Sequence, residues 1–511
     1  MTLDTFFKKF DTFAGAPNAV AKIRELVLQL AVQGKLVEQK HSDGKAKAIF
    51  SDGLPDEGEC RYEIPATWIW IRFASAGEQR LGKMLDQKGN RGELKPYLRN
   101  TNVQWMRFQL DDIKELRLAP EELEEFRLQP DDLLICEGGE PGRCAIWRDP
   151  HQEMYFQKAI HRVRPRKGIL SEYLAICLRV DAQNGVLAKK FTGATIKHFT
   201  GRSLREYSIA LPPLAEQRRI VAKVDELMAL CDRLESEQQE RQEKHAALAR
   251  ASLARFAEAP TPANLNLLFH KSYTVPPADL RKSILTLAAQ GRLVEQVPDK
   301  LKLKSDPNSD FSENEIPYPL PLGWKWKRLG AISEFVGGSQ PPKSKFIYEP
   351  KDGYTRFIQI RDFKSDSNLT FIPSNLANRP FNADDVMIGR YGPPVFQILR
   401  GLSGTYNVAL MKAIPDKDLI TKDFLFYLLQ EPRIQDRVIA DSERTAGQTG
   451  IRKPLLEAFV VGVPPLAEQR RIVAKVDELM ALVDALETQL ATARTSATHL
   501  LEAVVAELSS L

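Results

Sequence analysis

The sequence predicts two α/β (α+β) domains, related by a pseudo-two-fold axis and separated by two long antiparallel helices that form a coiled coil. Three observations support this fold class. The nineteen residues PPLAEQRRIVAKVDELMAL occur at Pro212–Leu230 and return unchanged at Pro464–Leu482. A mixed pattern of short strands and helices precedes each copy. Each copy then opens a long run with the heptad spacing of a coiled coil. The chain therefore contains one unit twice.

Composition limits the class of protein. The chain has 511 residues, enough for two to four domains, with 43% hydrophobic and 27% charged residues. Its net charge of +5 permits a polyanionic partner without requiring one. Five cysteines and no CxxC pair indicate reduced thiols and a cytoplasmic protein. The start, MTLDTFFKKFDTF, lacks the apolar core of a signal peptide, and no apolar run reaches membrane-spanning length, so no membrane association is expected.

The first predicted element is an amphipathic helix over residues 18–37. Ile23, Leu26, Val27 and Leu30 recur on one face, and Gly34 is expected to end the helix. The following segment QGKLVEQ, residues 33–39, matches QGRLVEQ at residues 290–296. The repeat therefore includes this region as well. We predict an N-terminal shared helix at 1–40 and its copy, with polar linkers, at 258–310.

The two predicted domains span residues 62–211 and 311–463. Paired segments run through both: IPATWIWIR with LPLGWKWKR, DDLLIC with DDVMIG, YFQKAIHRVRP with TYNVALMKAIP, and EYLAICLR with DFLFYLLQ. The first pair alternates as a strand does, the second is a short apolar strand before a Gly/Pro loop, and the last is a short helix. The tryptophans are expected to pack in the cores. The pattern of elements repeats, whereas loops and many side chains differ.

The two predicted long helices cover residues 212–257 and 464–511. Apolar residues step by three and four in both, and such a stripe needs a second helix to cover it. The first stripe is Ile220, Val224, Leu227, Cys231 and Leu234; the second is Ile472, Val476, Leu479, Val483, Leu486, Leu490, Ala493, Ala497, Leu500 and Val504. The other copy is the obvious partner. Polar residues at 235–245 interrupt only the first stripe, which leaves open whether the helices pair along their full length.

Several enzyme motifs are missing from the sequence. It has no GxGxxG, Walker A or HExxH motif, no Asn-Pro-Pro-aromatic motif of an amino-methyltransferase, and no spacing typical of a nuclease carboxylate cluster. No catalytic or metal-binding residues are therefore predicted. The remaining polar features are loops rich in Lys, Arg, Asn and Gln, at 83–102, 155–162, 192–202, 337–345, 356–364 and 444–453. Arg and Lys suit guanine and phosphate, and Asn and Gln suit adenine. A single such residue is more often merely solvated, but the clusters together favour contact with nucleic acid.

These motifs resemble one known family. PPLAEQRRIVAKVDELMAL after a variable domain, twice, resembles the specificity (S) subunit of Type I restriction–modification systems. LVLQLAVQGKLVEQ looks like its N-terminal shared region. GKMLDQKGNRGELKPYLRNTNVQW followed by DDLLICEGGEPGRCAIW resembles a first target-recognition domain. The resemblance covers nearly the whole chain, and the second domain matches more loosely.

The resemblance implies a function in host defence. Each target-recognition domain would read one half of a split target in double-stranded DNA. Two modification (M) subunits would dock on the helices and carry S-adenosylmethionine for adenine-N6 methylation. Two restriction (R) subunits would use ATP and Mg²⁺. The chain itself would hold no cofactor and catalyse nothing.

The resemblance also suggests site residues, because the family contacts DNA through loops of these domains. In the first domain the predicted DNA contacts are Lys83, Arg91, Arg99, Asn102, Arg143, Gln157, Lys158, Lys197 and His198. In the second they are Lys343, Lys345, Gln359, Arg361, Arg390, Tyr391, Asn407, Gln448 and Arg452. Repetition of the helix motif beside diverged domains suggests one surface used twice for one partner. The predicted docking residues are Glu216, Arg218, Arg219, Lys223, Glu468, Arg470, Arg471 and Lys475.

Other functions stay open at this stage. A stand-alone bipartite DNA-binding regulator shares the basic loops but does not need an unchanged repeat of the helix motif. A coiled-coil scaffold without a nucleic-acid role predicts no salt-dependent DNA affinity. An enzyme would transfer methyl groups without partners. The residues do not reveal the target, since readout includes DNA shape.

Overall fold

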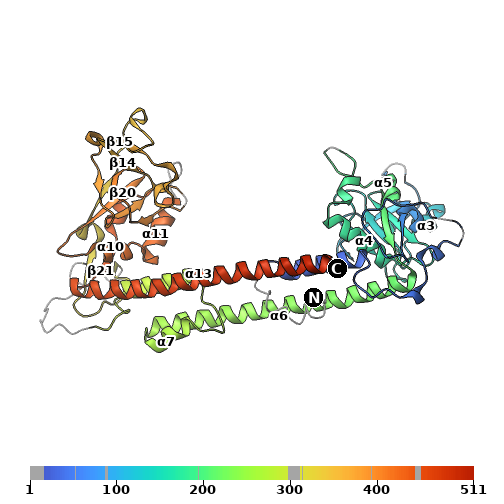
Figure 1. The fold of residues 1–511 in the computed structure, drawn as a ribbon, viewed down its shortest axis with the longest axis horizontal. Coiled ribbons are helices and arrows are strands. Elements are labelled where there is room, and N and C mark those ends of the chain that lie inside the picture. Colours follow the sequence, from blue (N-terminus) through green and yellow to red (C-terminus); the bar gives the residue numbers. More distant parts are fainter. Residues whose placement is uncertain are drawn as a thin grey trace. The chain divides into compact units, whose positions relative to one another are not determined.

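The structure is a computed structural model that describes residues 16–51, 53, 55–86, 90–193, 195–296, 311–312, 315–392, 394–443 and 450–510. The chain divides into two compact units (Figure 1). Unit 1 comprises residues 1–240 and 493–511, and unit 2 comprises residues 241–492. Each long helix therefore contributes to both units. Among the described residues, no helix is long and apolar enough to cross a membrane. All five cysteines are free thiols.

Unit 1 combines helices with small sheets. Its four-stranded antiparallel sheet has the order β2-β10-β7-β8, its three-stranded sheet the order β6-β3-β9, and β1-β11 and β4-β5 form pairs. The helices are α2 (Ala19–Val32), α3 (Pro120–Phe126), α4 (Ser171–Gln183), α5 (Gly201–Glu206) and parts of α6 (Leu214–Glu258) and α13 (Leu466–Ser510). The strands are β1 (Ile69–Arg72), β2 (Gly77–Leu81), β3 (Glu93–Leu98), β4 (Val103–Gln104), β5 (Arg107–Phe108), β6 (Lys114–Leu118), β7 (Leu133–Cys136), β8 (Cys144–Ile146), β9 (Tyr155–Phe156), β10 (Ile160–Pro165) and β11 (Ser208–Leu211).

Unit 2 repeats this plan. Its sheets have the orders β13-β20-β17-β18 and β15-β14-β19-β16, and β12-β21 form a pair. The strands are β12 (Lys325–Arg328), β13 (Ser333–Gly337), β14 (Tyr354–Ile358), β15 (Phe371–Pro373), β16 (Pro380–Phe381), β17 (Val386–Gly389), β18 (Gln397–Leu399), β19 (Gly404–Tyr406), β20 (Leu410–Pro415) and β21 (Val460–Val463). Besides parts of α6 and α13, the helices are α7 (Pro262–Leu268), α8 (Pro277–Ala289), α9 (Leu329–Ile332), α10 (Lys422–Leu428), α11 (Pro432–Glu443) and α12 (Lys453–Ala458). The repeat predicted from sequence is thus a repeat of topology.

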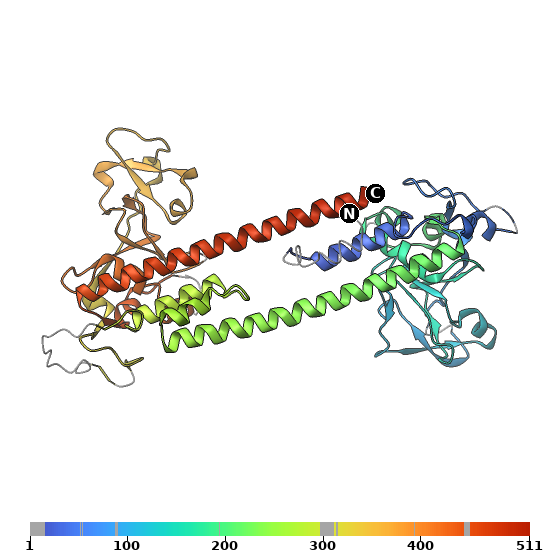
Figure 2. The same ribbon diagram turned by 60° about the horizontal axis from the view of Figure 1, so that its bottom comes forward.

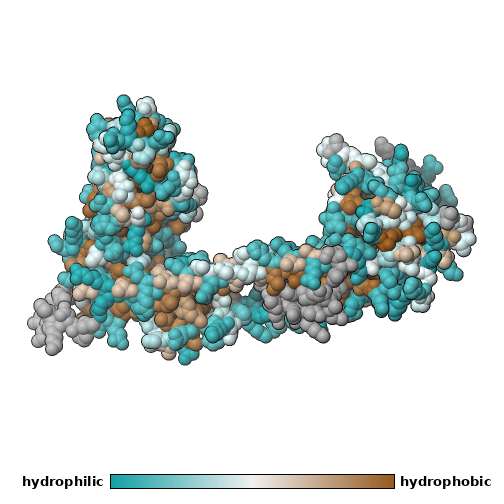
Figure 3. Space-filling view, in the orientation of Figure 1, coloured by the Kyte–Doolittle hydropathy of each residue, from teal (hydrophilic) through white to brown (hydrophobic). Residues whose placement is uncertain are grey.

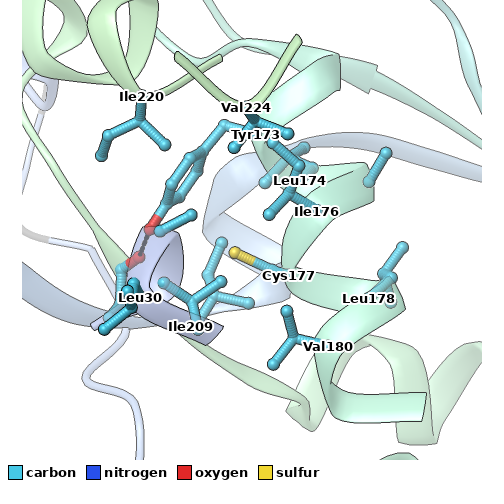
Figure 4. Packing of buried hydrophobic residues seen from close by; sticks show 14 of the residues in the cluster. Leu30, Tyr173, Leu174, Ile176, Cys177, Leu178, Val180, Ile209, Ile220 and Val224 are labelled. Carbon is cyan, nitrogen blue, oxygen red and sulfur yellow. Dashed lines mark hydrogen bonds between the residues drawn. The ribbon is translucent and has the colours of Figure 1, made fainter. Parts of the chain in front are cut away.

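Each unit has a main core that includes residues of both long helices. In unit 1 the core joins α2, α4, β11 and the start of α6, and Figure 4 shows Tyr173 between Ile220 and Val224. The Tyr173 hydroxyl donates to the carbonyl of Ala210 at 2.7 Å. As predicted, Trp68, Trp70, Trp324 and Trp326 are buried. The surface seen in Figure 3 is mainly hydrophilic, with scattered hydrophobic residues. In unit 2 the sheet that contains β14 and β15 lies at the end of the unit away from α13 (Figure 1).

The strand predicted over residues 64–72 is shorter than expected. β1 begins only at Ile69. Proline cannot donate to a sheet ladder, and the carbonyl of Pro65 accepts a hydrogen bond from the Trp68 amide at 2.9 Å, which closes a turn there. α2 begins within one residue of the predicted start at 18 but ends at Val32, five residues before the predicted end at 37. Gly34 follows its end with a φ of 74°, a left-handed conformation that favours glycine.

The long helices α6 and α13 have 45 residues each, about 68 Å at 1.5 Å per residue. Figure 2 shows both as continuous helices. The predicted stripe of α6 is buried from Ile220 to Cys231, and side chains at 239–244 are exposed. In α13 the stripe is buried from Ile472 to Val483 and again near the C-terminal end, in unit 1. There the prediction is wrong by one residue. Leu500 is 40% exposed and Leu501 is 0% exposed, so the heptad shifts after Ala497.

Candidate nucleic-acid interface

The same backbone frame supports the predicted DNA-contacting loops in both units. In unit 1, β3 runs parallel to β9, and the Gln157 amide donates to the Leu98 carbonyl at 3.2 Å. In unit 2, β14 runs parallel to β19, and the Asn407 amide donates to the Ile358 carbonyl at 3.1 Å. These bonds hold residue 99 beside residue 157, and residue 359 beside residue 407.

A third segment joins each frame through a glycine. Lys83 pairs with Gln157, and Ser339 pairs with Asn407, each in a parallel bridge. A Cβ on the preceding Gly82 would lie 2.2 Å from the Gln157 carbonyl oxygen, and one on Gly338 would lie 1.9 Å from that of Asn407. No other residue type fits such an approach. Both glycines therefore bring the loop after β2, or after β13, against the ends of the parallel strands.

A fourth segment is the loop that follows β7 or β17. The Glu137 amide donates to the Ala159 carbonyl at 2.9 Å, and the Arg390 amide donates to the Ala409 carbonyl at 2.8 Å. The backbone frame is therefore the same in both units, while its side chains differ. Unit 1 places Met84, Arg99, Glu137 and Gln157 where unit 2 places Gln340, Gln359, Arg390 and Asn407.

Asn102, a predicted DNA contact, supports the frame instead of lying on its surface. It is 3% exposed. Its Oδ1 accepts from the Arg99 amide at 2.9 Å, and its Nδ2 donates to the carbonyls of Gln109 and Asp112. Asp362 has the matching role in unit 2, where its Oδ2 accepts from the Gln359 amide at 2.7 Å. Because its amide is saturated, Asn102 positions Arg99 and is not accessible to a base in this structure.

Three predicted cations of the first domain are held in ion pairs. Lys83 pairs with Glu122, and Arg143 pairs with Glu140 and donates to the Asn100 carbonyl at 2.9 Å. Arg99 pairs with Asp112 at 2.6 Å. A hydrogen bond from Arg99 lowers the pKa of the Asp112 carboxyl, and a hydrogen bond from Lys83 lowers the pKa of the Glu122 carboxyl. Binding of phosphate or a base by these cations would require exchange of these partners.

The other predicted residues of the first domain lie at the surface of the same loops. Arg91, Lys158 and Lys197 are exposed, and Gln157 and His198 are half-buried. The His198 ring lies next to Gly138, since a Cβ there would be 3.2 Å from Nδ1. The structure therefore brings His198 and the 137–143 loop together.

The second domain carries freer cations. Lys343, Lys345 and Arg361 are exposed, with Arg361 Nε 3.8 Å from the Asp362 carboxylate, and the Arg390 guanidinium lies 5.2 Å from the centre of the Tyr391 ring. Arg452 is also exposed but donates to Asp441 at 2.6 Å. Gln359 and Asn407 are half-buried and come together in the frame. Gln448 lies outside the described residues. No group of three or more His, Cys, Asp or Glu in the described ranges could hold a metal ion.

The predicted docking residues Glu216 and Glu468 are buried, which conflicts with a docking role. Glu216 is 1% exposed, and it accepts from Gln39 Nε2 at 2.5 Å. Glu468 accepts from Gln296 Nε2 at 2.7 Å and from Trp324 Nε1 at 3.0 Å. Burial raises the pKa of the Glu216 carboxyl. Both glutamates therefore fasten the QGKLVEQ and QGRLVEQ segments to the start of a long helix.

Sequence reasoning missed the neighbouring glutamines. Gln217 Oε1 accepts from the Leu170 amide at 2.9 Å, and its Nε2 donates to the carbonyls of Gly168 and Pro212. Gln469 repeats this pattern with the Thr421 amide and the carbonyls of Leu419 and Pro464. Both glutamines are 0% exposed. Their signal was the return of Glu-Gln in both copies of the motif, together with Gln39 and Gln296.

The remaining docking candidates divide into paired and free residues. Arg219 is bidentate to Asp43, at 2.8 and 2.6 Å, and Arg471 donates to the Glu295 carbonyl. Lys223 and Lys475 pair with glutamates three residues later on their own helices. Arg218 and Arg470 are exposed. Internal contacts therefore account for most of the repeated motif. Arg471 is exposed as well but is held by the Glu295 carbonyl, whereas Arg218 and Arg470 are exposed at equivalent positions and carry no ion pair within the described residues.

Comparison with known proteins gives consistent matches. The specificity subunits of the Type I restriction enzymes EcoEI and EcoAI of Escherichia coli are each 23% identical to this chain, over 95% of the chain and 93% of each relative. The EcoKI specificity subunit of Escherichia coli strain K12 is 23% identical over 81% of both chains. A solved HsdS subunit from Thermoanaerobacter tengcongensis covers 88% of this chain and 98% of its own, with 21% identity and a TM-score of 0.47.

One sequence family matches both halves of the chain. The family described as Type I restriction modification DNA specificity domain matches residues 80–243 and again residues 321–493. Each match runs from the first strands of one domain into the following long helix. Because the two matches cover more than half of its length, the chain belongs to the Type I restriction–modification DNA specificity family.

Proposed function

We propose that each domain contacts one half of a split target in double-stranded DNA, and that the chain is the non-catalytic recognition subunit of a Type I restriction–modification enzyme. The repeated frame with different side chains carries this proposal. Equal backbones present different hydrogen-bonding groups at equivalent positions, such as Arg99 against Gln359 and Glu137 against Arg390. Two such surfaces suit a target whose halves differ in sequence.

The long helices support the second part of the proposal. α6 and α13 begin with the same residues, their Glu-Gln pairs make matching internal contacts, and they present Arg218 and Arg470 at equivalent exposed positions. Identical surfaces suit two copies of one partner. We assign them to two methyltransferase (M) subunits, which would hold S-adenosylmethionine. Two restriction (R) subunits with ATP and Mg²⁺ would complete the complex in the cytoplasm.

Deletion of the gene in its native host tests the proposal. We expect adenine methylation to vanish from one split sequence motif, and to return with a plasmid copy of the wild-type chain. Tagged chain is expected to copurify with a methyltransferase subunit. A plasmid copy that carries Gln489→Glu, at an exposed position of α13, is the control and should restore methylation as the wild-type copy does. An unchanged methylome together with no copurifying methyltransferase would contradict the proposal and favour a stand-alone DNA-binding regulator.

A further inference from the structure

A surface pocket in the second domain has the chemistry of a base-reading site. Its volume is about 530 Å³, within the range of pockets that bind small molecules. Three amide side chains line it, those of Gln340, Gln359 and Asn407. Phe346, Phe357 and two adjacent prolines form an apolar wall, and Lys343 lies at the pocket as well. The amides come from three segments far apart in the sequence.

Backbone hydrogen bonds hold these three segments together before any ligand binds. The Ser339 amide, next to Gln340, donates to the Tyr406 carbonyl at 3.2 Å. The Asn407 amide donates to the carbonyl of Ile358, next to Gln359, at 3.1 Å. The Asp362 carboxylate accepts a hydrogen bond from the backbone amide of Gln359 at 2.7 Å. The polar edge of the pocket is therefore preorganised, which reduces the entropy lost on binding.

The orientation of Asn407 selects the complementary ligand group. Its Oδ1 accepts from the Ala409 amide at 3.2 Å, so its Nδ2 remains as a donor at the pocket. Gln340 and Gln359 supply both amide donors and amide acceptors. Adenine offers an acceptor at N7 and a donor at N6 on its major-groove edge, and a side-chain amide matches that pair. Guanine offers two acceptors there, which only the NH₂ halves of the amides could satisfy.

We propose that this pocket reads an adenine in the half-site contacted by the second domain, through the amides of Asn407 and Gln359. The proposal rests on the DNA-reading function proposed above. Lys343 is placed to contact a neighbouring phosphate. The first domain cannot read its half-site in the same way. It has Met84, Arg99 and Gln157 at these positions, and Asp112 holds Arg99. The specificity of this pocket therefore belongs to one half of the target.

The Asn407→Asp variant tests the donor alone. Its retained Oδ1 still accepts from Ala409, and an acceptor replaces the Nδ2 donor. The purified complex with the methyltransferase partner would be titrated with duplexes of the methylome-derived target. In these duplexes, 7-deazaadenine, which lacks the N7 acceptor, replaces each adenine of the second half-site in turn. For the wild type we expect a loss of affinity of about tenfold at one position. The variant is expected to lose as much on the native duplex, with no further loss from 7-deazaadenine at that position.

The outcomes separate this proposal from the function on which it rests. If Asn407→Asp retains the wild-type penalty at every adenine, the pocket does not read N7 through this side chain and the proposal is overturned. If the wild-type complex shows no split target, both proposals fail. Gln359→Glu provides the same test should Asn407→Asp not fold. Gln489→Glu, with the same change of charge at an exposed site on α13, is expected to keep the wild-type pattern.

Discussion

Among single residues, Asp385 couples the second domain to pH. It lies directly before β17 with 5% exposure, and it pairs with Lys412 at 2.7 Å and Lys422 at 2.6 Å. Burial opposes ionisation, but hydrogen bonds from the two lysines outweigh it and lower the pKa of Asp385 to about 2. A lowered carboxyl pKa stabilises the folded state above the unfolded pKa, and this contribution is lost as pH falls through the folded pKa.

We therefore expect the stability of unit 2 to fall between pH 4 and pH 2. The Asp385 contribution corresponds to about 2 kcal/mol. Amide hydrogen exchange of Val386–Gly389 at pH 4 and at pH 2 measures this loss of stability. The Asp385→Asn variant should be less stable at pH 7 and should lose less of its remaining stability over this interval. Asp418→Asn, at an exposed position, is the control. An equal loss in Asp385→Asn and the wild type would contradict the assignment.

Residue types alone did not separate reading residues from supporting ones. Asn102 and Glu216 are polar residues in loops or at a helix start, where exposure is the usual outcome. Glu216 is buried because its partner Gln39 lies 177 residues away, and local spacing does not specify that contact. Asn102 is buried within its own loop, where its side chain bonds to the Arg99 amide and to the carbonyls of Gln109 and Asp112. Residue type does not reveal how that loop closes on the side chain.

At the scale of elements, spacing predicted the helices well and their contacts less well. The predicted bounds, 212–257 and 464–511, agree with those of α6 and α13 within two residues. However, α2 and α8 also pack on these helices. Arg24 of α2 pairs with Asp232 and Glu235 of α6, and Arg281 of α8 pairs with Asp484 and Glu487 of α13. A stripe covered by a shorter third helix does not have to keep one heptad register throughout.

The register at the end of α13 gives a test by adjacent residues. Leu501 is fully buried in the unit 1 core, whereas Leu500 is 40% exposed. We expect Leu501→Ala to lower the free energy of unfolding by about 2–5 kcal/mol, because it leaves a cavity. Leu500→Ala should cost under about 1 kcal/mol. Urea unfolding of the full chain compares them. If Leu500→Ala lowers the free energy of unfolding more than Leu501→Ala does, the register predicted from the sequence is correct and the shift after Ala497 is wrong.

For the whole molecule, the repeat combines two kinds of constraint. Glu216, Gln217 and Ile220 and their copies are repeated because each fastens the same packing in its own unit. The loop side chains differ because nothing in the frame requires them to be alike. The sequence could predict two units and the loop clusters, since both follow from repetition and residue type. It could not predict the pocket of Gln340, Gln359 and Asn407, which exists only where three distant segments meet.

The two exposed arginines of the repeated motif lead to a prediction of stoichiometry. Arg218 and Arg470 are equivalent and exposed, and neither forms an ion pair within the described part of the chain. If each contributes to one of two identical docking sites, Arg218→Glu and Arg470→Glu should each reduce the bound methyltransferase subunits from two to one. The double variant should bind none, since a reversed charge repels the group that the arginine attracts.

Native mass spectrometry of the copurified complexes counts the subunits directly. Arg494→Glu supplies a matched charge reversal on α13, at an exposed residue outside the repeated motif. It should leave two partners bound. Loss of both partners from a single variant would mean that the sites are coupled, whereas retention of both in the double variant would place docking on another surface. Equal losses from the two single variants would show that the repeat creates two independent sites, because each unit positions its own helix start through the contacts of its own Glu-Gln pair.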